Sequence, residues 1–555
     1  MSAPWHTLYP ANVPHEIDTA ACRSPLVQFL SAADQFSQRP AFGNFGCYLT
    51  YEESRNLAEN FAAYLSQECQ IKKGDRVAIM LPNVLSYPIA MLGTLMAGAT
   101  VVNTNPQYTP RELLHQLQDA GPTTIVILKH LMPTLSEVIS DTELRYVITV
   151  DVGDLLSLPK RWAINSLASF NYRNQRTMTA VASVPFRKAL SRGKTFNFAP
   201  VQIDPEDIAF LQYTGGTTGL SKGAMLSHRN IAANVLQISA FFPDIVEPGK
   251  EVVVTALPLY HIYALTFNCF CFLHHGGLVY LVTDPRNVKR FINEIKGLKF
   301  TAISGVNTLY KMILGAPNFD DIDFSRLKYA SSGGMAAQSS VANAWQEKTQ
   351  IFLGESYGLT EASPAVTANP PEVDYFTGSV GIPLPSTECS IRDGSGNELS
   401  AEEIGELWVR GPQVMRGYWQ NEAATKEILS DDGWLKTGDM AQMDERGMLR
   451  IVDRAKDLII VSGFNVYPNE VEEVAASHPN LVEVAVVGLP NEDTGEAVTL
   501  VAVSNSDTLT ESEVIDYCRQ QLTGYKKPTR VIFTDSLPKS NVGKILRRKV
   551  REIIA

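Results

Sequence analysis

The stretch Tyr213-Thr-Gly-Gly-Thr-Thr-Gly-Leu-Ser-Lys-Gly-Ala224 says more about the fold of this chain than any other segment. Its glycines let the main chain approach phosphate oxygens, and backbone N–H groups and threonine hydroxyls can then surround an anion. Lys222 adds positive charge. A Walker A loop needs Gly-Lys followed by Ser or Thr, whereas Ser221 here precedes the lysine. A flexible surface turn would not require these groups together, so we expect a phosphate-binding loop.

Strand-like and helix-like segments alternate on the N-terminal side of this loop, which indicates parallel sheets covered by helices. The predicted elements are strands at 75–81, 100–102, 123–128 and 146–150, and a helix at 88–99. After about Gly378, short strand-like runs between Gly- and Asp-rich turns predict an antiparallel, barrel-like part. The C-terminal residues predict a separate α+β unit, with helices at 468–477 and 511–522 and strands at 482–489 and 497–503.

Composition is that of an ordinary globular protein, with 555 residues, 45% hydrophobic and 19% charged. The net charge of −11 argues against nucleic acid as a partner. The 7 cysteines include no Cys-x-x-Cys pair, so we expect neither a zinc site nor a disulfide framework, and a reducing cytoplasm fits best. No signal peptide is visible. The uncharged stretch 252–283 is long enough to span a bilayer, but its proline, histidines and Gly-Gly pair favour short buried strands.

The loop and several later segments resemble the adenylate-forming superfamily of acyl-CoA synthetases, luciferases and peptide-synthetase adenylation domains. The segments Leu257–His261, Gly305–Leu309, Gly411–Met415, Val461–Glu470 and Leu537–Leu546 are similar to bacterial long-chain fatty-acid–CoA ligases in particular. The resemblance implies an α/β fold: a large N-terminal body of two helix-covered sheets plus a distorted β-barrel, with a small mobile α+β C-terminal domain. The expected divisions are residues 1–453, a hinge at 454–457, and residues 458–555.

The expected activity is that of an AMP-forming ligase, which joins a fatty acid to ATP as acyl-AMP and then transfers the acyl group to coenzyme A. ATP, Mg²⁺ and coenzyme A are therefore the expected cofactors and co-substrates. Tyr357 offers an aromatic face to adenine, and Glu361 a carboxylate to Mg²⁺. By resemblance, Asp439 and Arg454 contact the ribose. The full expected nucleotide set is Thr214, Gly215, Gly216, Thr217, Thr218, Gly219, Lys222, Gly333, Gly334, Tyr357, Gly358, Thr360, Asp439 and Arg454.

Lys544 is the residue expected to drive the first half-reaction. ATP and a carboxylate repel one another, and an ammonium group between them relieves that repulsion. A surface lysine in a basic tail is the competing interpretation, because Lys539, Arg547 and Arg548 lie close by. The expected catalytic set is Lys544, Glu361, Thr214 and His261.

The acyl pocket and the coenzyme A path follow from the resemblance alone. The expected acyl-pocket residues are His261, Leu265, Gly305 and Ser356, with Lys456 as the hinge and Gly463 beside the pantetheine arm. Ser356 stands where relatives usually have Gly, and Leu265 where some have an aromatic residue, so the preferred chain length stays open.

The segment 155–200 contains basic and aromatic residues but no acidic one. The basic residues are Lys160, Arg161, Arg173, Arg176, Arg187, Lys188, Arg192 and Lys194. Such a segment suits peripheral contact with an anionic membrane on its cytoplasmic face, and a solvated surface excursion is the alternative.

Three other functions compete with the fatty-acid–CoA ligase. They are transfer of the acyl group to a carrier protein, use of a medium-chain or aryl acid, and a non-catalytic nucleotide or lipid sensor. Retention of Lys222, Glu361, Asp439 and Lys544 together argues against the sensor. The oligomeric state stays open, a homodimer included.

Overall fold

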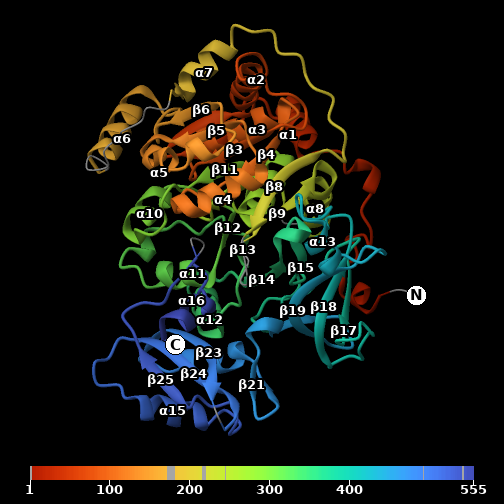
Figure 1. Cartoon of the computed structure of the whole chain (residues 1–555), viewed down its shortest axis with the longest axis vertical. Coiled ribbons are helices and arrows are strands. Elements are labelled where there is room, and N and C mark those ends of the chain that lie inside the picture. The colour runs from red at the N-terminus through yellow and green to blue at the C-terminus, as the bar shows by residue number, and fades with distance from the viewer. Residues whose placement is uncertain are drawn as a thin grey trace.

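A computed structural model describes residues 3–171, 182–214, 221–243, 246–491, 493–540 and 543–554. Within these ranges the strands form four sheets (Figure 1). Two largely parallel sheets build the upper and middle body, an antiparallel sheet lies beside them, and a smaller C-terminal unit lies at the opposite end from α2. This architecture matches the expected α/β class with a large body and a smaller C-terminal domain.

The first parallel sheet has the strand order β7-β6-β5-β3-β4-β8-β9 and carries the phosphate-loop segment on its last two strands. Its strands are β3 (Arg76–Met80), β4 (Thr100–Asn103), β5 (Thr124–Leu128), β6 (Tyr146–Val150), β7 (Val184–Pro185), β8 (Ile208–Thr214) and β9 (Lys222–Ser227). The strands expected from β-branched runs are thus present. They are buried on both faces, as expected for a parallel sheet covered by helices.

Helices cover this sheet, and some of them pack between it and the second sheet. They are α1 (Pro25–Gln35), α2 (Tyr51–Gln67), α3 (Ser86–Met96), α4 (Pro110–Ala120), α5 (Met132–Ser136), α6 (Leu158–Asn171), α7 (Phe186–Gly193) and α8 (His228–Phe241). Every residue of α3 is buried. Capping boxes begin α2 at Thr50 and α4 at Thr109, where each threonine side chain accepts from a backbone N–H and a glutamate reaches back.

The second sheet has the order β16-β15-β14-β13-β12-β10-β11-β1-β2. Its strands are β1 (Pro40–Asn44), β2 (Cys47–Thr50), β10 (Val252–Thr255), β11 (Leu278–Leu281), β12 (Ala302–Gly305), β13 (Tyr329–Ser332), β14 (Leu353–Gly358), β15 (Ala365–Ala368) and β16 (Ile382–Pro383). The helices that connect or cover these strands are α9 (Phe272–His274), α10 (Val288–Ile295), α11 (Asn307–Leu314) and α12 (Ser339–Thr349).

The uncharged stretch 252–283 is buried core, as expected, although it is not made of strands alone. β10 and β11 form its ends, and a π-helical turn, η5 (Ala264–Cys271), continues into α9 between them. Within the described ranges, no helix has both the length and the apolar character that a membrane span needs.

The part expected to be barrel-like is an antiparallel sheet with the order β17-β18-β19-β20. Its strands are β17 (Glu388–Arg392), β18 (Ile404–Arg410), β19 (Leu435–Met443) and β20 (Leu449–Arg454), and α13 (Glu422–Ile428) lies between β18 and β19 in the chain. β20 runs directly into the 3-10 turn η8 (Ala455–Asp457), which leads to the C-terminal unit.

The C-terminal unit has hydrophobic clusters of its own. Its elements are β21 (Ile459–Val461), β22 (Phe464–Val466), α14 (Pro468–Ala476), β23 (Leu481–Asn491), β24 (Gly495–Ser504), α15 (Glu511–Arg519), β25 (Arg530–Phe533) and α16 (Arg547–Ile554). Side chains from β21 to β25 and from α14 and α15 form one cluster, and a smaller one packs α16 against β23. This core is separate from the large cluster that joins the two parallel sheets.

Candidate active site

A cavity of about 2370 Å³ lies between the N-terminal body and the C-terminal unit. Ligand pockets usually measure about 300–1,000 Å³, so this cavity has room for more than one substrate group. The expected nucleotide residues that line it are Thr214, Lys222, Gly333, Gly334, Tyr357, Gly358, Thr360, Asp439 and Arg454, and the expected metal residue Glu361 lines it as well. Lys456 and Lys544 line it from the C-terminal side. Segments far apart in the sequence therefore meet at one place.

The phosphate loop joins β8 to β9, which are antiparallel neighbours. Thr214 ends β8 and Lys222 begins β9, and these two residues face each other as cross-strand partners. The expected loop residues Gly215, Gly216, Thr217, Thr218 and Gly219 lie outside the described residues. The two described flanks nevertheless bring the ends of the loop to the cavity wall.

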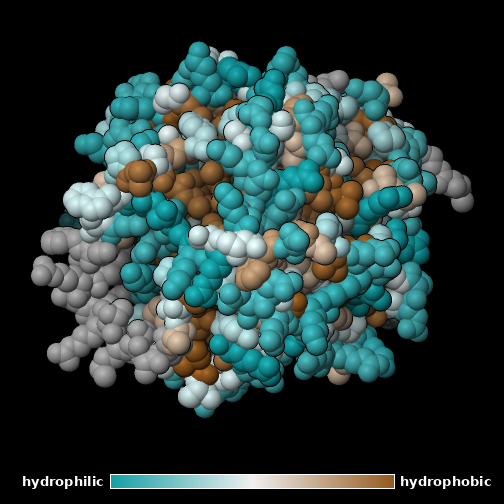
Figure 2. All heavy atoms as spheres, turned by 90° about the horizontal axis from the view of Figure 1, so that it is seen from above, coloured by the Kyte–Doolittle hydropathy of each residue, from teal (hydrophilic) through white to brown (hydrophobic). Residues whose placement is uncertain are grey.

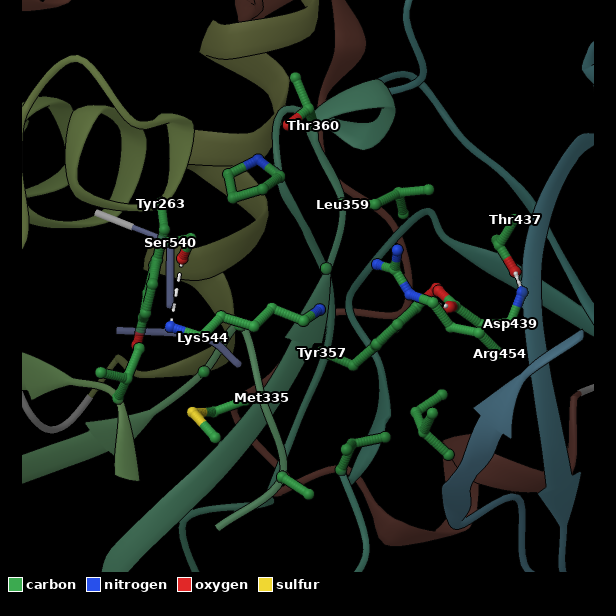
Figure 3. Close-up of a pocket in the computed structure, with 18 of the residues that line it drawn as sticks. Tyr263, Met335, Tyr357, Leu359, Thr360, Thr437, Asp439, Arg454, Ser540 and Lys544 are labelled. Atoms are coloured by element: carbon green, nitrogen blue, oxygen red, sulfur yellow. Dashed lines mark hydrogen bonds and ion pairs between the residues drawn. The ribbon is translucent and has the colours of Figure 1, made fainter. Parts of the chain in front are cut away.

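Tyr357, Asp439 and Arg454 form a connected group on the nucleotide side (Figure 3). The Tyr357 hydroxyl donates to Asp439 Oδ2 at 2.6 Å, and Arg454 Nε lies 3.4 Å from Asp439 Oδ1. Asp439 and Arg454 are cross-strand partners on β19 and β20, which explains their proximity. Burial and the adjacent Asp439 carboxylate hold the pKa of Tyr357 well above its usual value. The tyrosine therefore stays neutral and can present its ring to a base.

Glu361 has a partner that sequence reasoning missed. The Tyr418 hydroxyl donates to Glu361 Oε1 at 2.7 Å, and Lys222 Nζ lies 5.0 Å from the centre of the Tyr418 ring. Tyr418 forms a β-bridge with Ala224, and Trp419 N donates to Gly223 O at 2.8 Å, so this segment extends the sheet beside β9. Tyr418 thus contacts both Glu361, the expected metal ligand, and Lys222 of the phosphate loop.

The donor set around Glu361 fits Mg²⁺ held jointly by protein and nucleotide. Mg²⁺ usually takes one or two carboxylates together with substrate phosphates and water. Tyr418 occupies one oxygen of Glu361 and gives the carboxylate a fixed orientation. Among the described residues, no cluster of three histidine, cysteine or acidic side chains could hold a metal without such help.

Lys544 reaches across the cavity from the C-terminal unit. Figure 3 shows its side chain running from the side of Tyr263 toward Tyr357. Burial, with Arg454 as the next cause, lowers the pKa of Lys544 from 10.5 to about 8. Its backbone is held by Ser540, whose hydroxyl accepts from Lys544 N at 3.1 Å and whose N–H donates to Lys544 O at 2.7 Å. The lysine is therefore a desolvated cation aimed at the nucleotide side.

Gly543, directly before Lys544, lets this loop approach the N-terminal body. Its φ is +83°, and a Cβ added there would lie 2.7 Å from Thr308 Oγ1 on α11. Both facts favour glycine, because a side chain would be strained at that φ and would also push the loop away from α11. The position of Lys544 thus depends on a close contact between the two parts of the chain.

His261 and Tyr263 line the opposite wall. Burial, and then the nearby Lys544, lower the pKa of His261 to about 4, so the imidazole is neutral. His261 Nδ1 accepts from Tyr263 N at 3.3 Å, which leaves Nε2 to carry the proton. The Tyr263 hydroxyl lies 2.9 Å from Ser331 Oγ, and Tyr263 stands against Gly333, where an added Cβ would lie 3.0 Å from the ring. Ser356 is on the same wall, 3.5 Å from Ser331 through the hydroxyl oxygens.

Not every residue expected at the site reaches the cavity. Leu265 and Gly305 are buried behind the wall and do not line it. Gly463 is exposed at the tip of the β21–β22 hairpin, where Ser462 and Gly463 both have positive φ (50° and 83°). Two consecutive residues with positive φ are typical of the two-residue turns that connect the strands of a β-hairpin. In the described arrangement Lys544 therefore lines the cavity and Gly463 lies outside it.

Glu355 is a second residue that sequence reasoning passed over. It is buried on β14 and lines the cavity, and its Oε1 accepts from Ala337 N at 3.2 Å. Among the described residues, its Oε2 has no hydrogen-bond partner. Burial raises the pKa of Glu355 to about 7. A carboxyl group in a strand interior gives no signal in the sequence beyond its polarity.

Comparison with known proteins agrees with this geometry. Residues 29–419 match the family described as AMP-binding enzyme, and residues 470–544 match the AMP-binding enzyme C-terminal domain. The chain belongs to the AMP-binding enzyme family. It is 49% identical over 552 residues to a long-chain-fatty-acid–CoA ligase of Escherichia coli O157:H7, covering 100% of this chain and 98% of that one.

Two further relatives extend the comparison. A long-chain-fatty-acid–CoA ligase of Bacillus subtilis (strain 168) is 38% identical, covering 99% of this chain and 98% of that one. The crystal structure of ATP-bound MatB from Rhodopseudomonas palustris aligns with a TM-score of 0.81 at 29% identity, covering 95% of this chain and 98% of that one. The similarity thus extends along almost the whole length of the chain.

Proposed function

We propose that this chain is an AMP-forming long-chain fatty-acid–CoA ligase. It would join a fatty acid to ATP as acyl-AMP with release of pyrophosphate, and then transfer the acyl group to coenzyme A with release of AMP. The observation that carries the proposal is the partly buried Lys544, whose side chain extends toward Tyr357 with Asp439 and Arg454 beyond it. Identity of 49% to a relative of that name over the full chain supports the choice of substrates.

In the first half-reaction the carboxylate oxygen of the fatty acid attacks the α-phosphorus of ATP, and pyrophosphate leaves. Lys544 would lie between the two anions and stabilise the charge that spreads over the phosphate oxygens. Holding both reactants in line contributes further, since well-oriented pairs gain about 7–11 kcal/mol from proximity. Neutral His261 would border the acid without adding a second cation.

The nucleotide would be held by groups from three of the sheets. Tyr357 would present its ring to adenine, Asp439 would accept hydrogen bonds from ribose hydroxyls with Arg454 beside it, and Thr214 and Lys222 would contact the phosphates. Glu361 would hold Mg²⁺, which neutralises phosphate charge when bound. Tyr418 keeps the Glu361 carboxylate oriented toward that position.

The second half-reaction requires a different arrangement of the C-terminal unit. We place the hinge at residues 454–457, between an N-terminal part (1–453) and a C-terminal part (458–555). Lys456 in η8 would be the pivot. Rotation would withdraw Lys544 and bring the Gly463 hairpin to the cavity for the pantetheine arm. The exposure of the Gly463 tip in the described arrangement supports this proposal.

Product analysis tests the function. Purified protein is incubated with ATP, Mg²⁺, coenzyme A and either saturated acids of increasing chain length or an aryl acid, and AMP and thioester are quantified. We expect equal amounts of both products and the highest kcat/KM with long-chain acids. AMP formation without thioester would contradict transfer to coenzyme A, and a preference for aryl or medium-chain acids would contradict the substrate class.

We further propose that α6 contacts an anionic membrane surface that supplies the acid. Leu158, Trp162 and Leu167 are exposed on α6, with Trp162 at 76%, and Lys188 and Arg187 lie on α7 nearby in the basic segment. Part of the expected segment, residues 172–181, lies outside the described residues. Figure 2 looks onto this end of the molecule, where hydrophobic patches interrupt a largely hydrophilic surface.

Two members of the basic segment have structural partners instead. Lys160 Nζ donates to Phe45 O at 2.8 Å, and Arg192 pairs with Glu68 at 3.4 Å. Co-sedimentation with vesicles containing anionic lipid would therefore compare the wild type with Trp162→Ala and with Arg187→Gln/Lys188→Gln. Weaker binding by either variant supports membrane contact, and unchanged binding by both contradicts it.

A further inference from the structure

Arg547, the first residue of α16, contacts three carboxylates at once. Its Nε and Nη2 donate to both oxygens of Glu472 at 2.9 and 2.7 Å, and its Nη1 lies 2.8 Å from Asp453 Oδ1 and 3.6 Å from Asp457 Oδ2. It also donates to the Asn469 side chain. The guanidinium is largely buried, and these carboxylates raise the pKa of Arg547 above its usual value.

Asp453 belongs to the other side of the hinge. It lies on β20, where it pairs with Met440 of β19, and its side chain is 1% exposed. Its Oδ2 accepts from Asn469 N at 2.8 Å, and Asn469 Nδ2 donates to Val452 O at 3.0 Å. Asp453 therefore receives hydrogen bonds from two residues of the C-terminal unit while it is fixed in the antiparallel sheet.

The contacts of Arg547 divide into two kinds. Glu472 lies on α14 and belongs to the same unit as Arg547, so this pair survives any rotation of that unit. The pair with Asp453 crosses the segment 454–457 and would be separated by a rotation there. An unpaired buried carboxylate is strongly unfavourable, so the Arg547–Asp453 contact favours the arrangement in which it is made.

Arg547 is also close to Lys544 in sequence. The segment from Ser540 to Leu546 is closed by the β-bridge of Lys539 with Ile545 and by the Leu546 N–Pro538 O hydrogen bond at 2.9 Å. Arg547 thus fixes the end of the same loop that carries Lys544. Its anchor on Asp453 sets where that loop lies relative to Asp439 and Arg454, which are on β19 and β20.

We propose that Arg547 and Asp453 form an interdomain latch that positions Lys544 for acyl-adenylate formation and is released for thioester formation. The latch rests on the proposed two-step function. Arg547 and Asp453 are positioning residues that act through Lys544. Weakening the latch should impair the first half-reaction and spare the second, because only the first needs Lys544 in the cavity.

The test compares Asp453→Asn with a matched control, Arg548→Met. Asp453→Asn removes the interdomain charge but leaves Arg547 its partner Glu472. Arg548 is the next residue, is exposed, and within the described part of the chain pairs along its own helix with Glu552 at 2.7 Å. Acyl-AMP formation without coenzyme A and thioester formation from supplied acyl-AMP are measured separately. For Asp453→Asn we expect the first rate to fall about tenfold or more and the second to stay within about twofold, with both rates unchanged in Arg548→Met.

A direct measure of the arrangement accompanies the kinetics. Lys311 Nζ donates to Val482 O at 2.5 Å across the two parts. Because the tip of a long side chain makes this contact, cysteines at the two positions need a spacer rather than a direct disulfide. In Lys311→Cys/Val482→Cys, a short bifunctional methanethiosulfonate can therefore join the two cysteines only when the two parts are together. We expect this cross-link to form several-fold more slowly when Asp453→Asn is added. Equal loss of both half-reactions, or an unchanged cross-linking rate, would overturn the latch. A wild type that makes no acyl-AMP would instead overturn the proposed function.

Discussion

Lys544 has a partly buried ammonium group, and its pKa is lowered to about 8. Burial is the main cause, and Arg454 adds repulsion. Lysine shifts its pKa readily when buried, so the same residue stays a cation near neutral pH and loses its charge within the ordinary working range. Acyl-AMP formation should therefore depend on pH in a way that reports on this one side chain.

The expected pH profile follows from the direction of that shift. The lowered pKa means that Lys544 is protonated below about pH 8 and neutral above it. Because kcat/KM reports ionisations of the free enzyme, kcat/KM for acyl-AMP formation should fall about tenfold per pH unit above that value. Thioester formation from supplied acyl-AMP is the control and should lack this limb. Parallel profiles for the two half-reactions would contradict the assigned role.

Removing the ammonium group tests the same residue without titration. In Lys544→Ala, acyl-AMP formation should fall roughly 100- to 1,000-fold, the range seen when one donor to a developing negative charge is deleted. Conversion of supplied acyl-AMP to thioester should continue, because the proposed rotation withdraws Lys544 from the cavity in that step. Pyrophosphate release and thioester yield measure the two steps. Lys549→Ala, a neighbouring lysine on α16, serves as the control.

At the scale of elements, the segment around Tyr418 joins parts that are distant in sequence. It pairs with β9 through Ala224 and donates to Glu361, a partner 57 positions away. Partners of metal-ligating groups typically affect metal affinity by roughly 10- to 100-fold. Tyr418→Phe keeps the ring over Lys222 but removes the hydroxyl, so it isolates the contact with the carboxylate.

For Tyr418→Phe we expect the Mg²⁺ concentration that gives half-maximal acyl-AMP formation to rise roughly tenfold. Binding of Mn²⁺ in the presence of ATP, followed by electron paramagnetic resonance, should weaken to a similar degree. This second measurement does not depend on turnover. Tyr48→Phe, at an exposed tyrosine on β2, is the control. Unchanged metal binding in Tyr418→Phe would show that the hydroxyl does not orient Glu361.

The sequence predicted the regular elements well where the pattern was short and β-branched. The runs that became β3, β4, β5 and β6 are compact and bounded by turn residues, which favours strands. The stretch 252–283 was harder, because a buried helical turn and a buried strand are both apolar and lack a distinguishing period. The residues of η5 therefore gave no local sign that they would be helical.

The site could be predicted only as far as motifs reach. Four of the predicted residues belong to short motifs that indicate their chemistry, and all four line the cavity: Tyr357, Glu361, Asp439 and Lys544. Tyr418, Glu355 and Arg547 lack such a segment. The Arg547–Asp453 contact spans 94 positions, and only the folded chain brings these residues together. Leu265 and Gly305 lie behind the cavity wall because of tertiary packing, which the spacing of residues in the sequence does not reveal.

At the scale of the whole molecule, the cavity is completed by contacts between its two parts. Besides the Arg547 contacts, Gly543 lies against Thr308, and Lys311 reaches Val482 O. If Lys544 and Gly463 serve alternate half-reactions, a protein held in the present arrangement can perform only the first. Domain closure of this kind is a common way to give one bound intermediate two different environments.

A reversible lock makes this a measurable outcome. In Lys311→Cys/Val482→Cys joined by the bifunctional methanethiosulfonate, we expect a single round of acyl-AMP formation and loss of thioester production, because the C-terminal unit cannot rotate. Reduction removes the cross-link and should restore thioester production, so each sample is its own control. Normal turnover in the fully cross-linked protein would contradict the rotation. The protein's own cysteines are mostly buried, which limits competing modification.

The separate hydrophobic core of the C-terminal unit affects the effective concentration of Lys544 at the cavity. Because that unit packs around its own side chains and is joined to the body by the few residues of η8, Lys544 behaves as a tethered reagent. Short tethers give effective concentrations on the order of millimolar or more. A free polypeptide carrying residues 458–555 would have to be supplied at about that level to replace the attached one. The covalent link thus makes acyl-AMP formation independent of how dilute the enzyme is.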